Sequence, residues 1–405
     1  MTDQPEAVSR TQETIDRFSR YVIGNYTRLP IVAVRGEGPY LWDADGRRYL
    51  DLFSGWAVTG VGHCHPRLVE AIREQAGRLI YMPNTWYTEP QGRLAQWIAE
   101  TGFGGKTFFC NSGTEANEAA IKLARIHTPP GKYKIISFED SFHGRTFASI
   151  TATAQPRYHQ GFQPLVPGFV YAPLNDLEAV EKLADEETCA VLVEPIQGEG
   201  GVNLARAEWL KALRDLCDAR GMVLIFDEVQ TGVGRCGTWW GYQTVDVVPD
   251  IMTMAKQLAG GTAIGAMCAR EDVAASLVPG THAATFGGNP LAAAAGCAVF
   301  EIIRDENLLD NATQMGTYLR QKLLELKQET THIAEVRGMG LMIGVDLTQN
   351  GADLAAACLD KGLHVNCTHE TVLRIMPPLN ITREQLDEGL AILAEAMNEW
   401  QAHGT

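Results

Sequence analysis

The sequence predicts an α/β protein with a mostly parallel sheet and a second, smaller α+β domain. Between about residue 105 and residue 270, short continuous apolar runs alternate with helical stretches. Such runs indicate strands covered on both faces, as in parallel sheets. Beyond residue 340 the pattern changes to short strands followed by a long amphipathic segment. A chain of 405 residues can hold two such domains.

The large domain is read from its strand segments, which are "KTFFC", "KYKIISF", "CAVLVEP", "GMVLIF" and "DIMTMA". A helix-like "EANEAAIKLARIH" follows the first of them. Another helix is predicted in "ARAEWLKALRDLCDARG", where Gly221 would end it. Its apolar residues fall on one helical face, and they are Trp209, Leu210, Leu213, Leu216 and Cys217.

The two ends of the chain are expected to build the small domain together. "GPYLWDADGRRYLDL" predicts a strand, a turn at Asp45-Gly46 and a second strand. "LMIGVDL", "GLHVNC" and "VLRIMPP" predict strands, and residues 383–400 an amphipathic helix. We therefore expect an N-terminal segment (1–60) packing with the small domain, a large domain (61–300) and a C-terminal domain (301–405).

Composition excludes several classes of protein. A formal net charge of −15 without a basic block argues against a nucleic-acid partner. The nine cysteines include no C-x-x-C pair, which favours buried thiols in a reducing compartment. The N-terminus lacks the apolar stretch of a signal peptide, and no window approaches a membrane span. We expect a cytoplasmic protein that does not bind membranes.

Lys256 and Asp227 are the most informative residues. Lys256 interrupts the apolar run "VPDIMTMAKQLAGG", and Asp227 ends the strand in "MVLIFDEVQTG". Burial favours the neutral, nucleophilic lysine amine, which can condense with a carbonyl. A carboxylate at the end of a buried strand requires a cationic partner. Together they suit pyridoxal phosphate, with the lysine on its aldehyde and the aspartate on its protonated ring nitrogen.

A phosphate site is predicted where a strand ends in Asn111-Ser112-Gly113-Thr114 and a helix begins. Free N–H groups and the helix dipole attract phosphate, and Gly113 allows close approach. Ser112 and Thr114 add hydroxyl donors. The alternative is an ordinary helix cap without a ligand, but Lys256 and Asp227 favour phosphate.

Two residues of "SFHGRT" are candidates for the same site. Phe142 could stack on an aromatic cofactor. Arg145 could hold a carboxylate, because its planar fork matches two oxygens. The simpler reading of this hexapeptide alone is a core phenylalanine and a surface arginine.

Other charged residues have simpler alternatives as well. Glu194 and Glu199 lie in the loop "VEPIQGEGG" and could be solvated. Arg374 interrupts the strand "TVLRIMPPLN", where it anchors a substrate carboxylate or points to water from an edge strand. The pair of histidines in "GHCHP" lacks further ligands nearby, so we expect no metal site.

These motifs resemble the class III, ornithine-type aminotransferases among the fold type I pyridoxal-phosphate enzymes. The resemblance spans nearly the whole chain and rests on "NSGTEANEAAIKLAR", "FHGRT", "EPIQGEGGV", "LIFDEVQTGVGR" and "TFGGNPLA", in that order. It implies a large domain with a mostly parallel seven-stranded sheet between helices, and a smaller α+β domain from both termini.

The resemblance also implies roles around the cofactor. Lys256 matches the lysine that bonds the cofactor, and Asp227 the partner of its ring nitrogen. Gln230 matches the side chain near the phenolic oxygen, and Val229 and Phe142 the residues packed against the two ring faces. Further cofactor positions are Ser112, Gly113, Thr114, Glu194 and Thr285. Thr285 matches a threonine that reaches the phosphate of the neighbouring subunit, which implies a homodimer with shared sites.

Substrate roles follow in the same way. Arg374 matches the arginine for the α-carboxylate of glutamate or 2-oxoglutarate, and Glu199 the acid that pairs with it when the other substrate is bound. Arg145 would grip the far carboxylate of either substrate. Trp56 falls where relatives carry a tyrosine or a small aliphatic residue, which leaves the amino donor open. After Lys256, "QLAGGTAIGA" also departs from the usual glycine-rich run.

The implied reaction is transfer of the ω-amino group of N2-acetyl-L-ornithine to 2-oxoglutarate. The products would be N-acetylglutamate 5-semialdehyde and glutamate, as in arginine biosynthesis. Ornithine, succinylornithine or 4-aminobutyrate are alternative donors. An aminomutase is disfavoured by Gln230 and the Glu199–Arg374 pair, and a non-catalytic cofactor-binding regulator by the lack of a DNA-binding segment.

Overall fold

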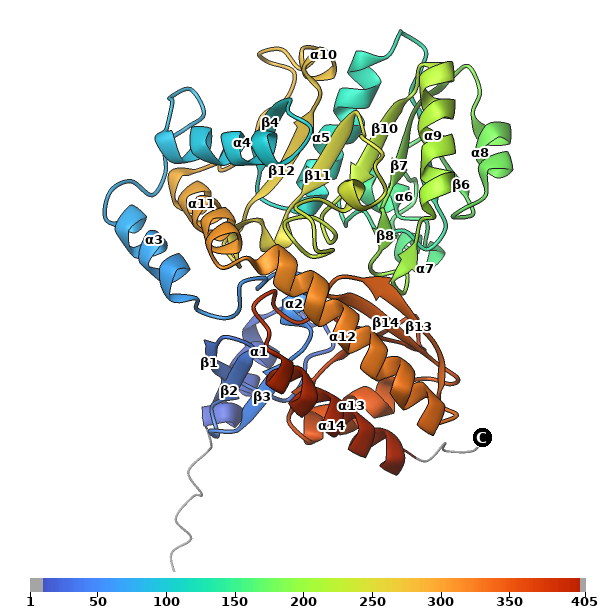
Figure 1. Cartoon of the computed structure of the whole chain (residues 1–405). Helices are drawn as coiled ribbons and strands as arrows, with labels where there is room; N and C mark the ends of the chain where they lie inside the picture. The colour runs from blue at the N-terminus through green and yellow to red at the C-terminus, as the bar shows by residue number, and fades with distance from the viewer. Residues whose placement is uncertain (1–9, 401–405) are drawn as a thin grey trace, which may run out of the picture.

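A seven-stranded sheet forms the centre of the large domain (Figure 1). The computed structural model describes residues 10–400. The strand order is β4-β12-β11-β10-β7-β5-β6, and among these strands only β12 runs antiparallel to its neighbours. Their bounds are β4 Lys106–Cys110, β5 Lys134–Phe138, β6 Phe169–Ala172, β7 Thr188–Val193, β10 Val223–Asp227, β11 Ile251–Met254 and β12 Gly265–Ala269. The predicted α/β fold with a mostly parallel sheet is confirmed.

The central strands are apolar throughout because both of their faces are covered. Every residue of β7 and β10 is buried. Along β10, Leu224 and Phe226 belong to one apolar cluster, whereas Val223 and Ile225 belong to another on the opposite face. Successive side chains of a strand point to opposite faces, so a strand between two helical layers has no polar side.

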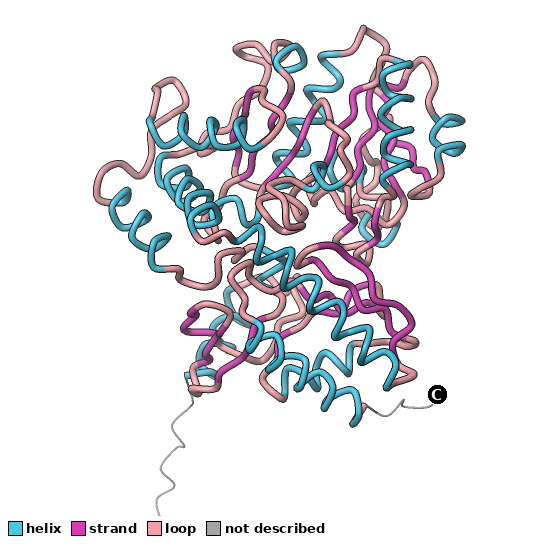
Figure 2. Tube along the Cα trace, viewed as in Figure 1, coloured by secondary structure: helices cyan, strands magenta, loops and turns pink. Residues whose placement is uncertain are grey.

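The two helical layers are visible in Figures 1 and 2, where helices flank the sheet. Helices α5 and α6 supply apolar residues to one face, and α4, α8, α9 and α11 to the other. The helices of this domain are α3 Pro66–Ala76, α4 Glu89–Thr101, α5 Gly113–His127, α6 Phe147–Ala152, α7 Pro156–His159, α8 Leu177–Leu183, α9 Ala207–Arg220, α10 Glu271–Ala274 and α11 Pro290–Asp305. Short β8 (Ile196–Gln197) and β9 (Asn203–Leu204) pair beside them, and 3-10 turns span Gly241–Thr244 and Lys256–Ala259.

Elements from the N-terminal and C-terminal parts of the described chain share the lower body of Figure 1. One sheet has the order β1-β2-β3-β15, in which the late strand β15 runs parallel to β3. The other, β13-β14-β17-β16, is antiparallel. The strands are β1 Ala33–Glu37, β2 Tyr40–Asp43, β3 Arg48–Asp51, β13 Ile333–Met339, β14 Met342–Leu347, β15 Leu363–His364, β16 Asn366–Thr368 and β17 Val372–Ile375. The helices are α1 Arg10–Tyr21, α2 Ser54–Ala57, α12 Leu308–Glu329, α13 Ala352–Asp360 and α14 Arg383–Glu399.

Several local predictions are confirmed. Helix α9 ends at Gly221, whose left-handed φ of 58° glycine tolerates without strain. The turn at Asp45-Gly46 joins β2 to β3, and Gly46 has a φ of 84°. The segment "GLHVNC" instead contributes to two strands in two sheets, β15 and β16. Among the described residues, no helix combines the length and apolarity needed to cross a bilayer.

Asp51 connects three parts of the chain through hydrogen bonds to its carboxylate. It ends β3 and is 2% exposed. One carboxylate oxygen lies 2.9 Å from His63 Nε2, and the other lies 2.9 Å from His364 Nδ1. Backbone N–H groups of Phe53 and Ser54 donate to the same carboxylate. Burial alone would raise the pKa of Asp51, but the two imidazoles outweigh burial and hold it well below its usual range.

We predict that Asp51→Asn lowers the free energy of unfolding by about 1–3 kcal/mol at neutral pH. The amide keeps the shape but loses the charge that both imidazoles face. Because the folded-state pKa of Asp51 is depressed, this stabilisation is present at neutral pH and is lost in acid as pH falls through that pKa. Urea unfolding at fixed protein and cofactor concentration measures the loss. Asp215→Asn, on the exposed side of α9, is the control and should change little.

Candidate active site

A cavity of about 380 Å³ opens where β4, β5, β7, β10 and β11 reach their carboxyl ends. Open α/β sheets bind ligands at this edge. Ten of the sequence-predicted residues line the cavity, namely Ser112, Gly113, Thr114, Phe142, Arg145, Glu194, Asp227, Val229, Gln230 and Lys256. Four others, Trp56, Glu199, Thr285 and Arg374, are not part of its lining.

Lys256 lies directly after β11, in a strained backbone conformation. Its φ is 50°, a left-handed value that costs a non-glycine residue of order 1–3 kcal/mol. Burial lowers the pKa of the amine to about 8, and Arg374 acts in the same direction. Glu199, Asp227 and Glu194 oppose that change. The lysine therefore has a substantial neutral fraction near physiological pH.

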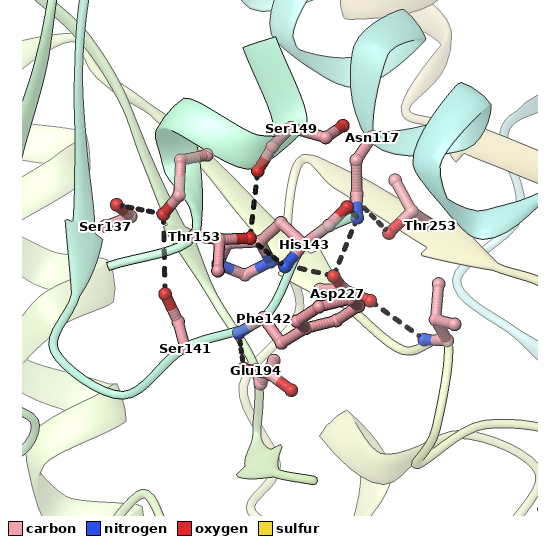
Figure 3. A network of polar contacts seen from close by, with 12 residues as sticks. Asn117, Ser137, Ser141, Phe142, His143, Ser149, Thr153, Glu194, Asp227 and Thr253 are labelled. Atoms are coloured by element: carbon pink, nitrogen blue, oxygen red, sulfur yellow. Dashed lines mark hydrogen bonds and ion pairs between the residues drawn. The ribbon is translucent and has the colours of Figure 1, made fainter. Parts of the chain in front are cut away.

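Asp227 ends β10 and accepts three hydrogen bonds (Figure 3). Its Oδ2 lies 2.8 Å from Asn117 Nδ2 and 2.8 Å from His143 Nδ1. Its Oδ1 accepts from the backbone N–H of Val229 at 3.0 Å. A carboxylate only accepts, so His143 carries a proton on Nδ1. The carboxylate is thus fixed in place at the floor of the cavity, with 3% exposure.

Asn117 and His143 were missed by the sequence reasoning. Asn117 lies on α5 and is itself held by Thr253 Oγ1 of β11 at 2.8 Å, and it donates to the His143 carbonyl. Asn117 could have been found as a polar residue among the alanines of an apolar helix face. A buried polar group needs a hydrogen-bond partner, so its position indicates one. His143 lies between Phe142 and Arg145 in "SFHGRT", but its partner Asp227 is 84 residues away in the sequence.

The N-terminus of α5 faces the cavity. Ser112 caps the helix and accepts from the Glu115 N–H at 3.3 Å. The first N–H groups of a helix have no partner within it, so those beginning at Gly113 can bind an anion. A Cβ on Gly113 would lie 3.0 Å from the Val229 side chain. Thr114 accepts hydrogen bonds from the backbone of Arg145 and Thr146, which joins this terminus to the "SFHGRT" loop.

Phe142 and Glu194 form another wall. The Glu194 carboxylate accepts from the Phe142 N–H at 3.0 Å and from the Gly198 N–H at 3.1 Å. Burial raises the pKa of Glu194 to about 7, and Asp227 adds to the effect, while His143 and the two backbone bonds oppose it. Glu194 is therefore a buried acid rather than the solvated loop residue of the simpler reading.

Gln230 lies against Gly198, whose missing side chain leaves room for it. A Cβ on Gly198 would come within 2.2 Å of the Gln230 amide. Gln230 Oε1 is buried and has no hydrogen-bond partner among residues 10–400, and the same is true of His143 Nε2. Buried polar atoms without partners are unfavourable unless a ligand supplies them.

Arg374 and Glu199 form a two-pronged ion pair beside the cavity. Arg374 Nη1 lies 2.7 Å from Glu199 Oε1, and Nη2 lies 3.2 Å from Oε2. Arg374 is 1% exposed and also donates to Asn366. Burial would raise the pKa of Glu199, but the charge of Arg374 outweighs it and lowers that pKa. The arginine of β17 is therefore internal and paired, not an edge residue facing water.

The remaining predicted residues lie outside this group. Trp56 is 49% exposed and packs edge-on against Phe53, over which the Arg374 guanidinium also lies. Thr285 is exposed. The two histidines of "GHCHP" contact different carboxylates, those of Asp51 and Glu306. No cluster of three metal-binding side chains occurs among residues 10–400.

Comparison with known proteins identifies the family. Residues 21–397 match the Aminotransferase class-III family model. The chain belongs to the class III aminotransferases. It is 50% identical over 386 residues to an acetylornithine aminotransferase of Caldanaerobacter subterraneus subsp. tengcongensis, covering 94% of this chain and 98% of that protein. A Methanocaldococcus jannaschii protein of the same name is 46% identical, with 95% and 98% covered.

Solved structures of class III aminotransferases agree. An ornithine aminotransferase from Toxoplasma gondii superimposes with a TM-score of 0.93 at 32% identity, covering 97% of this chain and 96% of that one. An acetylornithine aminotransferase from Elizabethkingia anophelis gives 0.86 at 33% identity, covering 96% and 99%. The fold type I architecture expected from the sequence is therefore confirmed.

Class III aminotransferases use pyridoxal phosphate, and the cavity fits this cofactor. It offers one lysine amine, one fixed carboxylate and one helix N-terminus, which suit the aldehyde, the ring nitrogen and the phosphate respectively. The unpartnered Gln230 Oε1 adds a polar atom at its wall. The donor set therefore suits the aldehyde, the ring nitrogen and the phosphate of the cofactor.

We predict that His143→Leu slows the amine half-reaction about ten- to a hundredfold. Asp227 would lose one of its three hydrogen bonds, and a bond to a charged group contributes about 1.5–3 kcal/mol. The pH dependence of the bound cofactor's absorbance should shift in the same variant. Thr153→Val is a matched control, since its hydroxyl bonds the backbone N–H of His143 and the Ser149 carbonyl rather than the imidazole. An unchanged rate and titration in His143→Leu would contradict this role.

We also predict that the cofactor-free protein captures pyridoxal phosphate with a pH midpoint near 8. The neutral amine is the nucleophile, so the rate rises as pH passes the lysine pKa, well below the ordinary value of about 10.4. Stopped-flow absorbance follows the reaction, and Lys256→Ala should give none. Glu199→Gln should lower the midpoint further, because that negative charge raises the pKa of Lys256. A midpoint near 10 would refute the prediction.

Proposed function

We propose that this chain transfers the ω-amino group of N2-acetyl-L-ornithine to 2-oxoglutarate, yielding N-acetylglutamate 5-semialdehyde and glutamate. The observation that carries the proposal is the near-complete coverage of relatives named acetylornithine aminotransferase, at 45–50% identity. The paired Arg374 and Glu199 support it, because they suit a site that alternates between two different substrates. Arginine biosynthesis is the corresponding metabolic role.

The residues of the cavity have distinct tasks in this proposal. When bound, pyridoxal phosphate supplies an aldehyde that bonds amines and a ring that accepts the electrons of a broken C–H bond. Lys256 Nζ takes the proton from the substrate carbon that bears the amine and later returns it. Asp227 keeps a proton on the ring nitrogen through its negative charge. Ser112, Gly113 and Thr114 hold the phosphate, and Phe142 and Val229 enclose the ring.

The site must bind glutamate or 2-oxoglutarate at one time and the ω-amino donor at another. Arg374 is suited to this alternation. A buried arginine without a partner is costly. Glu199 neutralises Arg374 in the structure, and this arrangement suits the donor, whose reacting end has no carboxylate. We infer that the α-carboxylate of glutamate displaces Glu199 from Arg374.

We further propose a homodimer. Large apolar side chains are exposed in the N-terminal segment, between residues 79 and 87, and at Phe286 beside Thr285. The most exposed are Ile23, Tyr21, Tyr26, Trp86 and Tyr87. Such a surface is typical of an interface, and symmetric dimers are the most frequent oligomers. Thr285 would then contribute to the partner's site rather than to its own.

A reducing compartment such as the cytoplasm fits the same picture. The cysteines at the nine positions of the sequence are all free thiols, and seven of them are buried. Disulfides are typical of oxidising compartments, so this usage supports an intracellular enzyme.

Ornithine is the second candidate donor. The placement of Trp56 is the observation that makes it worth testing. Its indole is half exposed beside Phe53, at the side of the molecule where Arg374 and Glu199 lie. A bulky residue near the substrate path can discriminate between a free and an acylated α-amine. The fold and cofactor chemistry are the same for both donors.

The test is a half-reaction with the purified holoenzyme. N-acetylornithine, ornithine, succinylornithine and 4-aminobutyrate are added separately, and loss of the lysine-bound cofactor's absorbance band is timed. We expect N-acetylornithine to have the highest kcat/KM, by about tenfold or more over ornithine. Mass spectrometry of the products with 2-oxoglutarate should identify the semialdehyde and glutamate.

Two variants complete this experiment. Lys256→Ala should abolish turnover, and Trp56→Val should change the ranking of donors more than the rate with glutamate. If ornithine or 4-aminobutyrate reacts fastest, the substrate assignment is wrong and the chemistry stands. If the cofactor binds but no donor reacts, a non-catalytic cofactor-binding protein becomes the better description.

A further inference from the structure

Arg145 stands at the wall of the cavity with its donors unused. Its backbone N–H bonds Thr114, but its guanidinium has no hydrogen bond or ion pair among residues 10–400. The side chain belongs to an exposed residue that lines the same cavity as Lys256. A guanidinium with five free N–H donors is suited to grip a carboxylate with two parallel bonds.

Aromatic rings hold this guanidinium. Its Cζ lies 4.0 Å from the centre of the Tyr158 ring and 5.4 Å from the centre of the Phe142 ring. The two rings themselves meet edge to face, 5.8 Å apart. A guanidinium stacked on a ring is restrained through its face, so the N–H donors in its plane remain free. An ion pair would instead have occupied those donors.

Tyr158 is itself held in place by its neighbours in the chain. It lies on the short helix α7, whose His159 bonds the carbonyls of Ile150 and Thr153. Arg157 donates to the Tyr158 hydroxyl at 3.0 Å and to Gln155 Oε1 at 2.9 Å.

Gln155 completes this support from below. It is 3% exposed, and its amide donates to the carbonyl of Ser141 at 3.0 Å and to that of Asp140 at 3.2 Å. Ser141 directly precedes Phe142 in the chain. The support of Tyr158 therefore returns to the loop that carries both Phe142 and Arg145.

Arg157 adds a second positive charge to the same ring. Its Cζ lies 4.7 Å from the Tyr158 centroid. One aromatic ring thus has two guanidinium groups against it, one lining the cavity and one fixed to the hydroxyl. The charge of Arg145 already reaches the interior of the site, since it contributes to the lowered pKa of Glu199. This corner of the cavity favours an anionic group.

We propose that Tyr158 is a positioning residue that sets substrate selectivity through Arg145. By restraining the guanidinium face, Tyr158 directs its free donors at the carboxylate remote from the reacting carbon. Because these donors bind that carboxylate, the site selects carboxylate-bearing substrates over simple amines. The inference rests on the proposed function, which it deepens by naming what orients the clamp. No contact of Tyr158 with the substrate is required.

The test measures binding of glutarate, a dicarboxylate that cannot exchange an amino group, to the holoenzyme by calorimetry. Tyr158→Leu should weaken glutarate about tenfold, because the stacking is lost. Tyr158→Phe keeps the ring face and should stay within about threefold of the natural chain. In an Arg145→Gln background, Tyr158→Leu should have no further effect, since the two residues then act as one unit.

A kinetic readout accompanies the binding cycle. Selectivity for glutamate over pentylamine, which has no carboxylate, should fall about tenfold in Tyr158→Leu, through KM rather than kcat. If Tyr158→Leu weakens glutarate as much in the Arg145→Gln background as alone, Tyr158 acts on the fold or on Phe142, and the proposal is overturned. An equal loss in Tyr158→Phe would overturn it as well.

Failure of the proposed donor would look different. If N-acetylornithine does not react but the glutarate cycle shows coupling of Tyr158 to Arg145, the positioning role stands and the donor assignment falls. If N-acetylornithine reacts well and the cycle shows no coupling, the reverse holds.

Discussion

The buried carboxylate of Asp227 is the constraint on which the site depends. A negative charge at 3% exposure needs several donors, and the chain supplies them from three separate places. Asn117 comes from α5, His143 from the loop after β5, and the Val229 N–H from the turn after β10. Thr253 of β11 then holds Asn117 in turn. One charge therefore locks a helix, a loop and two strands of the sheet into a single arrangement.

The charges around Lys256 form a second level of the same design. Burial and Arg374 lower the pKa of its amine, whereas three carboxylates oppose that change. Those carboxylates are differently placed, since Glu199 is paired with an arginine and Glu194 accepts from two backbone N–H groups. Moving any one of these charges alters the proton affinity of the lysine. The pKa of Lys256 is therefore set by burial and by all of these charges together.

The sequence predicted those parts of the protein that depend on local patterns. The α9 face, the cap at Gly221 and the turn at Asp45-Gly46 all follow from side-chain periodicity or backbone freedom. Lys256 and Asp227 could be identified from the sequence because a charged residue in an apolar run is unusual. The antiparallel β12 could not be read in this way, since strand direction is set by connections across the fold rather than by composition.

Partners that lie far apart in the chain were the main omission. Asn117 and Asp227 are brought together only by the packing of α5 on the sheet, and no spacing in the sequence announces it. Tyr158 is only 13 residues from Arg145, but the contact of its ring with the guanidinium depends on where the short helix α7 is placed. The resemblance to a known family supplied positions that match its motifs, but it did not supply the residues that orient them.

The pairing of β3 with β15 has a consequence for how the molecule is made. Leu50 and Asp51 lie opposite Leu363 and His364, so about three hundred residues separate strands that share one ladder. During synthesis the first strands leave the ribosome long before their neighbour exists. The large domain can collapse around its own sheet meanwhile, and β1, β2 and β3 can pair with one another, but β3 stays without β15 until residues 363–364 have been made. Such distant contacts are slow to form. Until β15 is in place, β3 is an edge strand whose open side can pair with other chains, and β15 closes that side.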